Sequence, residues 1–110
     1  MKEIVEYLKN KNIICKTLRE ILPKELGSRK KIEIYTGTNL TGYYCSVMLL
    51  EKKSRLLRRE AGELMDLHEK LEAYRDTKIL TRYIRIRAPL CSKARALFEE
   101  NGWKVWHEIQ

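Results

Sequence analysis

Residues 31–50 read KIEIYTGTNLTGYYCSVMLL and decide the fold, because they predict a β-hairpin. Polar and apolar side chains alternate over residues 31–36, as in a half-buried strand. Residues 43–50 are almost wholly apolar, which suits a strand that is covered on both faces. The loop between them, GTNLTG at 37–42, is rich in turn-forming residues. The hairpin therefore forms the start of the expected sheet.

The first 27 residues predict two short helices before the hairpin. Apolar residues fall on one side of the first helix at Ile4, Val5 and Leu8. A second helical stripe follows, and Pro23 or Gly27 ends it. The members of this second stripe are Cys15, Leu18, Ile21 and Leu22.

After the hairpin, residues 54–76 predict a long amphipathic helix with Ser54 as its N-cap and an apolar arc about 180° wide. Residues 79–87 predict a strand, and Pro89 begins the next helix. Asn101-Gly102 supplies a left-handed cap to that helix, and residues 103–109 predict the last strand. A strand, a helix and a strand in succession imply a parallel pair with a right-handed crossover.

These elements predict an α+β fold in which helices pack against a mixed four-stranded sheet. The order is two short N-terminal helices, the hairpin, the long helix, then strand–helix–strand. A length of 110 residues is typical of one domain, so we expect a single domain over residues 1–110.

Several protein classes are disfavoured by the composition. No segment is long and apolar enough to cross a bilayer, and the N-terminus lacks the features of a signal peptide, which predicts a cytoplasmic protein without a membrane partner. Cys15, Cys45 and Cys91 show no CxxC spacing, so we expect reduced thiols. His68 lies on the apolar helix face and is expected in the core. His107 has no ligand-type neighbour in the sequence, so no metal site and no cofactor are predicted.

Positive charge is the most informative feature of the composition. The chain has 23 Lys and Arg against 15 Asp and Glu, a net charge of +8, and most of the excess lies in the first 60 residues. The hairpin ends and the start of the long helix bring basic residues to one end of the sheet, where a helix N-terminus and guanidinium groups favour phosphate. The predicted nucleic-acid-binding residues there are Lys30, Lys31, Lys52, Lys53, Arg55, Arg58 and Arg59. The alternative is a solvated cationic rim.

A second basic feature is the segment TRYIRIR at residues 81–87. Because side chains alternate along a strand, Tyr83, Arg85 and Arg87 share one face. A tyrosine flanked by arginines is typical of surfaces that hold single-stranded nucleic acid by stacking and phosphate contacts. An ordinary exposed sheet face fits the same pattern.

Glu33, followed by Glu51-Lys52-Lys53 after an apolar strand, resembles the metal-binding acids and lysine of the PD-(D/E)XK nucleases. The first acid is Glu rather than Asp, and the proline that precedes it in the family is missing. If residues 37–42 form the loop, Glu33 pairs with Ser46 and lies roughly 17 Å from Glu51. Carboxylates must lie within a few ångströms of each other to share a metal ion.

The sequence thus favours a small basic protein that binds RNA or DNA through phosphates, with little sequence specificity and without catalysis. One alternative is an adaptor that binds a protein partner or a second copy through helix 54–76. The other is a degenerate metal-dependent nuclease built on Glu33, Glu51 and Lys53.

Overall fold

The computed structural model describes residues 2–108, with Lys2 described by its backbone alone. It contains three α-helices, five strands and one short 3-10 helix, η1. In chain order these elements are α1 (Lys2–Asn10), β1 (Lys16–Ile21), η1 (Pro23–Leu26), β2 (Ile32–Thr38), β3 (Tyr44–Glu51), α2 (Arg58–Arg75), β4 (Thr81–Arg87), α3 (Ser92–Glu100) and β5 (Trp103–His107).

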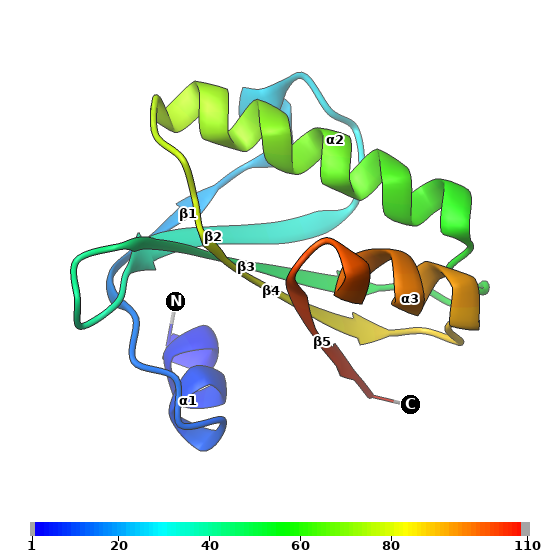
Figure 1. Ribbon diagram of the computed structural model, residues 1–110, viewed down its shortest axis with the longest axis horizontal. Helices are drawn as coiled ribbons and strands as arrows, with labels where there is room; N and C mark the ends of the chain where they lie inside the picture. The colour runs from blue at the N-terminus through cyan, green and yellow to red at the C-terminus, as the bar shows by residue number, and fades with distance from the viewer. Residues whose placement is uncertain (1, 109–110) are drawn as a thin grey trace.

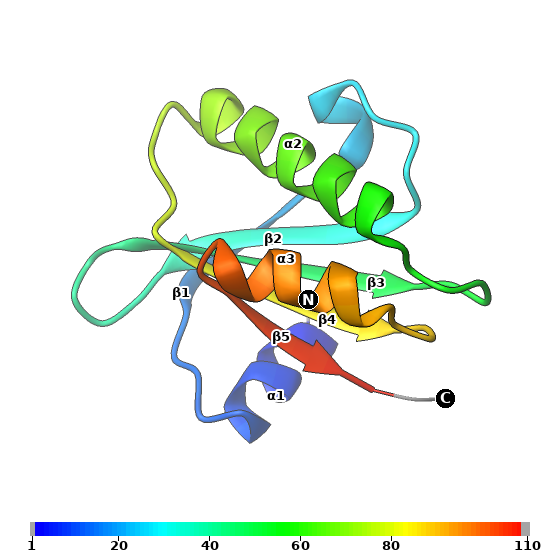
Figure 2. The same cartoon turned by 45° about the vertical axis from the view of Figure 1, so that its right-hand side comes forward.

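The five strands form one mixed sheet in the order β1-β2-β3-β4-β5. Strand β2 is antiparallel to both of its neighbours, β1 and β3, whereas β3, β4 and β5 run parallel to one another. Two parallel pairs require two crossovers, which α2 and α3 provide. Both helices cover the same face of the sheet, whereas α1 covers the opposite face (Figures 1 and 2). The expected α+β class and mixed sheet are therefore confirmed.

Each face of the sheet has its own apolar core. The α2/α3 face buries Ile34, Met48 and Ile84 against the two helices. The α1 face buries a smaller cluster, which consists of Ile4, Leu8, Tyr35, Val47 and Leu49. The continuous apolar sequence of β3 is explained by this arrangement, because its side chains alternate between two covered faces.

The second N-terminal helix was predicted wrongly, and the sheet has five strands rather than four. Residues 16–21 form strand β1, which contains a bulge: the four residues from Lys16 to Arg19 lie opposite the three residues from Thr36 to Thr38 on β2. Thr17 at the bulge has a left-handed φ of 55°. Because of the extra residue, Cys15 and Leu18 face the same side of the sheet at a spacing of three, which imitates a helical stripe. Ile21 packs in the core on the opposite side.

The hairpin is present, but its register differs from the expected one by three residues. Its turn spans residues 39–43 rather than 37–42, and the Asn39 amide donates to the Tyr43 carbonyl at 2.9 Å. The Asn39 side chain accepts hydrogen bonds from the Thr41 and Tyr43 amides at 3.0 Å each, and Gly42 adopts a φ of 88°. Consequently Glu33 pairs with Leu49, not with Ser46.

The long helix begins at Arg58, four residues after the predicted cap at Ser54. The preceding segment is extended, because Leu56 forms a parallel bridge with Leu90. The Leu56 amide donates to the Pro89 carbonyl at 2.8 Å, and its carbonyl accepts from the Cys91 amide at 3.1 Å. Tertiary pairing of this segment therefore overrides the capping preference of Ser54.

The C-terminal part follows the prediction closely. Strand β4, helix α3 and strand β5 form the expected parallel unit, although Pro89 precedes the first turn of α3 and Cys91 is its N-cap. Gly102 has the expected left-handed φ of 81°. The predicted last strand extended to residue 109, which lies outside the described residues. Among residues 2–108, no helix is long and apolar enough to span a membrane.

Candidate functional site

The β2–β3 ladder brings Glu33 and Glu51 together on the α1 face of the sheet. Glu33 pairs with Leu49, and Glu51 lies two residues further along β3 on the same face. Such diagonal neighbours lie roughly 7–8 Å apart at their Cα atoms, close enough for two glutamate side chains to converge. Both side chains are exposed. The register thus removes the separation of the two acids that was expected from the sequence.

Opposite charges alternate across the strands at the end of this face. Glu51 pairs with Arg87 on β4, and their side chains approach within 4.0 Å. Arg87 Nε donates to the Glu108 carboxylate at 3.0 Å. Continuing the β2–β3 register by one residue places Lys31 opposite Glu51. The carboxylate of Glu51 therefore has the Arg87 guanidinium within 4.0 Å on the β4 side, and the backbone of Lys31 lies opposite Glu51 on the β2 side.

Helix α1 contributes Tyr7 to the row of charged side chains formed by Glu51, Arg87 and Glu108. The Tyr7 hydroxyl donates to the Glu108 carboxylate at 2.8 Å. Burial opposes the ionisation of Glu108, but the hydrogen bonds from Tyr7 and Arg87 outweigh it and hold the pKa of Glu108 below its ordinary value. Burial, and then Glu108, raises the pKa of Tyr7. Tyr7 and Glu108 thus fix the position of Arg87 beside Glu51.

A second tyrosine holds Glu33. The Tyr35 hydroxyl donates to the Glu33 carboxylate at 2.9 Å, and burial together with this contact raises the pKa of Tyr35. Since only one carboxylate oxygen is engaged in this contact, Glu33 keeps acceptor capacity toward solvent. Neither Tyr35 nor the Tyr7–Glu108 pair was identified from the sequence. The partners of the second pair are separated by 101 residues, so no local pattern indicates it.

The predicted strand face on β4 lies partly beneath α1. Tyr83, Arg85 and Arg87 do share one face, as alternation requires. However, Tyr83 stacks on Trp106 with ring centroids 5.0 Å apart, and Arg85 is 9% exposed below the Tyr7 ring. Only Arg87 reaches the open end of the face, where it contacts Glu51.

The basic residues predicted at the end of the sheet divide into two groups. Three of them form ion pairs with acids of α2. Lys30 contacts Glu63 at 2.9 Å, Arg59 approaches the same carboxylate at 3.8 Å, and Lys52 contacts Glu60. The hydrogen bond from Lys30 holds the pKa of Glu63 below its ordinary value.

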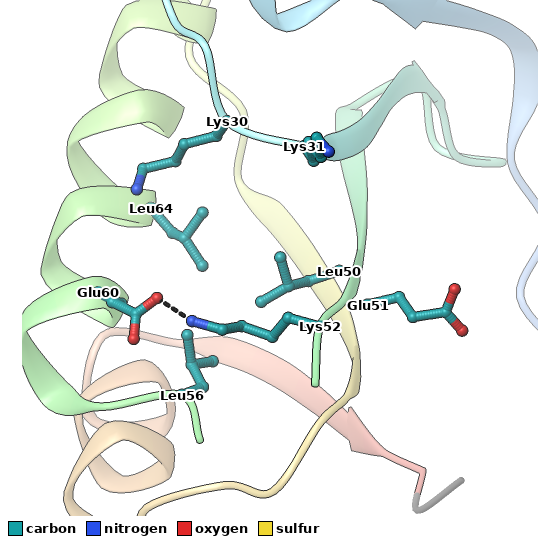
Figure 3. Close-up of a pocket in the computed structure, with 8 residues that line it drawn as sticks. All are labelled: Lys30, Lys31, Leu50, Glu51, Lys52, Leu56, Glu60 and Leu64. Carbon is teal, nitrogen blue, oxygen red and sulfur yellow. Dashed lines mark hydrogen bonds and ion pairs between the residues drawn. The ribbon is translucent and has the colours of Figure 1, made fainter. Parts of the chain in front are cut away.

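These paired lysines line a pocket of about 330 Å³ between α2 and the ends of β2 and β3 (Figure 3). Its apolar wall consists of Leu50, Leu56 and Leu64. Figure 3 shows the Lys52 side chain directed toward Glu60 on α2, while the Glu51 carboxylate points away from it. Adjacent residues of the chain thus serve opposite faces: Lys52 supports the packing of α2, and Glu51 belongs to the α1 face.

The remaining four cations are exposed and have no acidic partner within 4.0 Å among residues 2–108. These are Lys31, Lys53, Arg55 and Arg58. Arg55 lies close enough to Cys91 to contribute, after the backbone amides of Ala94 and Lys93, to lowering the pKa of that thiol. These four cations therefore extend from the start of β2 to the start of α3.

The histidines and cysteines show no sign of a metal site. In the part of the chain that the structure describes, no three His, Cys, Asp or Glu side chains cluster in a way that could hold a metal. His68 is buried, as expected, and its Nε2 lies 2.9 Å from Ser46 Oγ. His107 Nε2 lies 2.8 Å from the Ala88 carbonyl oxygen. All three cysteines are free thiols.

Solved structures show which fold this arrangement belongs to. The protein is similar to EndoMS in its apo form, with a TM-score of 0.56 and 18% identity over 99% of this chain and 46% of that one. It is also similar to a repair endonuclease from Pyrococcus abyssi, with a TM-score of 0.55 and 15% identity over 98% and 46% of the two chains. An EndoMS–dsDNA complex matches with a TM-score of 0.53 and 16% identity over 98% and 44%. The chain thus spans less than half the length of these proteins.

At these identities the comparisons establish the fold. No family profile and no curated protein matches the sequence. The sequence favoured a binding protein over an enzyme, and the comparisons correct that expectation, because the chains that share this fold include a repair endonuclease.

Proposed function

We propose that this chain is a DNA-binding nuclease domain that hydrolyses phosphodiester bonds with the help of a divalent metal ion at Glu33 and Glu51. The observation that carries the proposal is the β2–β3 register, in which Glu33 and Glu51 are diagonal neighbours on the α1 face with both side chains exposed. The similarity in fold to EndoMS and to a repair endonuclease supports the same conclusion. The resemblance of Glu33 and Glu51-Lys52-Lys53 to the PD-(D/E)XK pattern agrees with it.

The donor set fits a Mg²⁺-type ion. Such ions are commonly bound by one or two carboxylates, with waters and substrate phosphate oxygens completing the shell. Glu33 and Glu51 supply two carboxylates, and their exposure leaves room for those other ligands. Arg87, at 4.0 Å from Glu51, balances the charge of the pair before an ion arrives. When bound, the metal would activate water and stabilise the charge that develops on the phosphate.

The chain's own cations would bind and orient the DNA backbone. Lys53 is exposed just beyond the end of β3, two residues after Glu51, at the position of the lysine in the family pattern. Arg87 is held beside Glu51 by Glu108 and presents a guanidinium group suited to phosphate. The cations without acidic partners would contact phosphates on either side of the site.

A cleavage assay tests the proposal. Labelled duplex DNA, single-stranded DNA and RNA are incubated with the protein in Mg²⁺, Mn²⁺ or EDTA. We expect metal-dependent cleavage of DNA that is lost in the double variant Glu33→Gln/Glu51→Gln, while DNA binding in EDTA is retained. Glu69→Gln/Glu100→Gln removes two exposed carboxylates from α2 and α3 on the opposite face and should cleave normally.

Either of two results would reject the proposed site. The first is an absence of cleavage of every nucleic acid in both metals. The second is equal activity of the wild type and the Glu33→Gln/Glu51→Gln variant. Preferential cleavage of RNA would instead show that the substrate class was misassigned.

A further inference from the structure

Cys15 and Cys45 are distant in the sequence but meet on the α1 face of the sheet. Cys45 on β3 is the cross-strand partner of Gly37 on β2. The chain that enters β1 passes directly over this glycine: a Cβ added to Gly37 would lie 2.6 Å from Cys15 Sγ and 2.7 Å from the Lys16 carbonyl oxygen. The absence of a side chain at Gly37 therefore lets the Cys15 sulfur approach that of Cys45.

The two thiols differ in their access to solvent. Cys45 is 1% exposed, whereas Cys15 is half-buried and borders a pocket of about 520 Å³ between α1 and β1. Hydrogen bonding to Cys45, and then burial, raises the pKa of Cys15, whereas hydrogen bonding from Cys15 and from the Gly37 amide lowers the pKa of Cys45 against the opposing effect of burial. Cys15 is therefore the accessible thiol of the pair, and Cys45 is the more acidic one. A reagent can thus reach Cys15 first, and Cys45 is placed to react with it second.

We infer that Cys15 and Cys45 form an intramolecular disulfide when the protein meets a small-molecule disulfide. Cys15 attacks the reagent, displaces one thiol and becomes a mixed disulfide. The Cys45 thiolate then attacks the Cys15 sulfur and releases the second thiol. One reagent disulfide is reduced to two thiols, which take up the two protons that the cysteines lose, and one protein disulfide is formed.

This bond would join the connection between α1 and β1 to a central strand. Without it, residues 11–15 are the only covalent connection between α1 and the sheet. Helix α1 covers the face that carries Glu51 and Arg87. A disulfide closes a long loop and restricts the unfolded chain. The modification site does not depend on the proposed nuclease activity.

Peptide mapping by mass spectrometry after treatment with oxidised glutathione tests the inference. The Cys91→Ser variant serves as the background, because residues 15 and 45 are then the only cysteines. We expect the intact mass to fall by two hydrogen atoms and a non-reducing digest to contain the peptides of Cys15 and Cys45 linked together. Adding Cys45→Ser should stop the reaction at one glutathione on Cys15.

The inference is overturned if the Cys91→Ser protein retains glutathione on Cys15, or if both thiols remain open to iodoacetamide after treatment. Because Cys45 is buried, its replacement could unfold the chain. Cys15→Ser provides the second test, since Cys45 should then resist glutathione in the folded protein. Ready modification of Cys45 in that variant would equally contradict the inference.

Discussion

Glu33 lies diagonally across the β2–β3 ladder from Glu51, because Glu33 pairs with Leu49. This relationship depends on a five-residue turn that Asn39 closes with its side chain. If the loop were residues 37–42, Glu33 would pair with Ser46, and the same two acids would be too far apart to share an ion. The geometry of the turn therefore decides whether the face can hold a metal.

The division of the cations into paired and unpaired groups predicts different effects on DNA affinity. Neutralising Lys31, Lys53 and Arg55 with Gln should weaken DNA binding in EDTA and reduce the slope of log K against log salt by about 2 to 3, because each phosphate contact contributes about 0.9. Fluorescence anisotropy at several salt concentrations measures this slope.

The matched control replaces the three cations that are ion-paired with α2, Lys30, Lys52 and Arg59, by Gln. It removes the same formal charge, but we expect at most half the change in slope, because these side chains are already neutralised by Glu60 and Glu63. If both triple variants change the slope equally, net charge rather than a defined surface governs binding.

The apolar arc of α2 is occupied by the protein's own core. Leu67 is 4% exposed, and Tyr74 at the edge of the arc is 45% exposed with its hydroxyl donating to Glu25 at 2.8 Å. Leu67→Gln should therefore lower the free energy of unfolding by about 2–4 kcal/mol, whereas Tyr74→Gln should change it by less than about 1 kcal/mol. Urea unfolding measures both. If the Leu67 variant kept full stability, Leu67 would not belong to the core, and this surface of α2 would again be a candidate for binding a protein partner.

How far the sequence predicts this molecule depends on the range of the interactions involved. The alternation of Thr81–Arg87 and the Asn101-Gly102 cap act locally, and both predictions held. The segment at residues 16–21 failed because a bulge at Thr17 gives a strand the spacing of a helix. Similarly, Ser54 is a favourable cap by itself, but the bridge between Leu56 and Leu90 keeps the chain extended past it.

The candidate site shows the same limit. Glu33, Glu51 and Lys53 could be identified by residue type and spacing, but their proximity depends on the hairpin register. GTNLTG offers several turn formers, and local preference does not decide between a loop at 37–42 and a turn at 39–43. Tyr7 and Glu108 come from opposite ends of the chain, and only the folded sheet brings them together.

Buried His68 predicts that stability falls as the pH is lowered. Burial lowers the pKa of His68 to about 4, so the unfolded chain, with a His pKa near 6.5, binds a proton that the folded protein excludes. The contribution is present above about pH 6.5, falls as the pH drops, and is lost below about pH 4, for a total of roughly 3 kcal/mol. His68→Gln should flatten this dependence between pH 6.5 and 4.5 in urea titrations. An unchanged slope in the His68 variant would contradict the assignment.

Two glycine-to-alanine changes should shift stability in opposite directions. A Cβ at Gly37 meets Cys15 Sγ and the Lys16 carbonyl oxygen well inside normal contact distance, so Gly37→Ala must displace the chain that enters β1. We expect a loss of about 1–3 kcal/mol, as for other overpacked positions. Gly62, in the middle of α2, has no atom within 4 Å of an added Cβ, so Gly62→Ala should gain about 0.5–1 kcal/mol from helix propensity. Chemical unfolding of both variants measures the two shifts. If the Gly37→Ala protein were as stable as the wild type, residues Cys15 and Lys16 would not lie over β2. The close approach of Cys15 to Cys45 would then lose its structural basis.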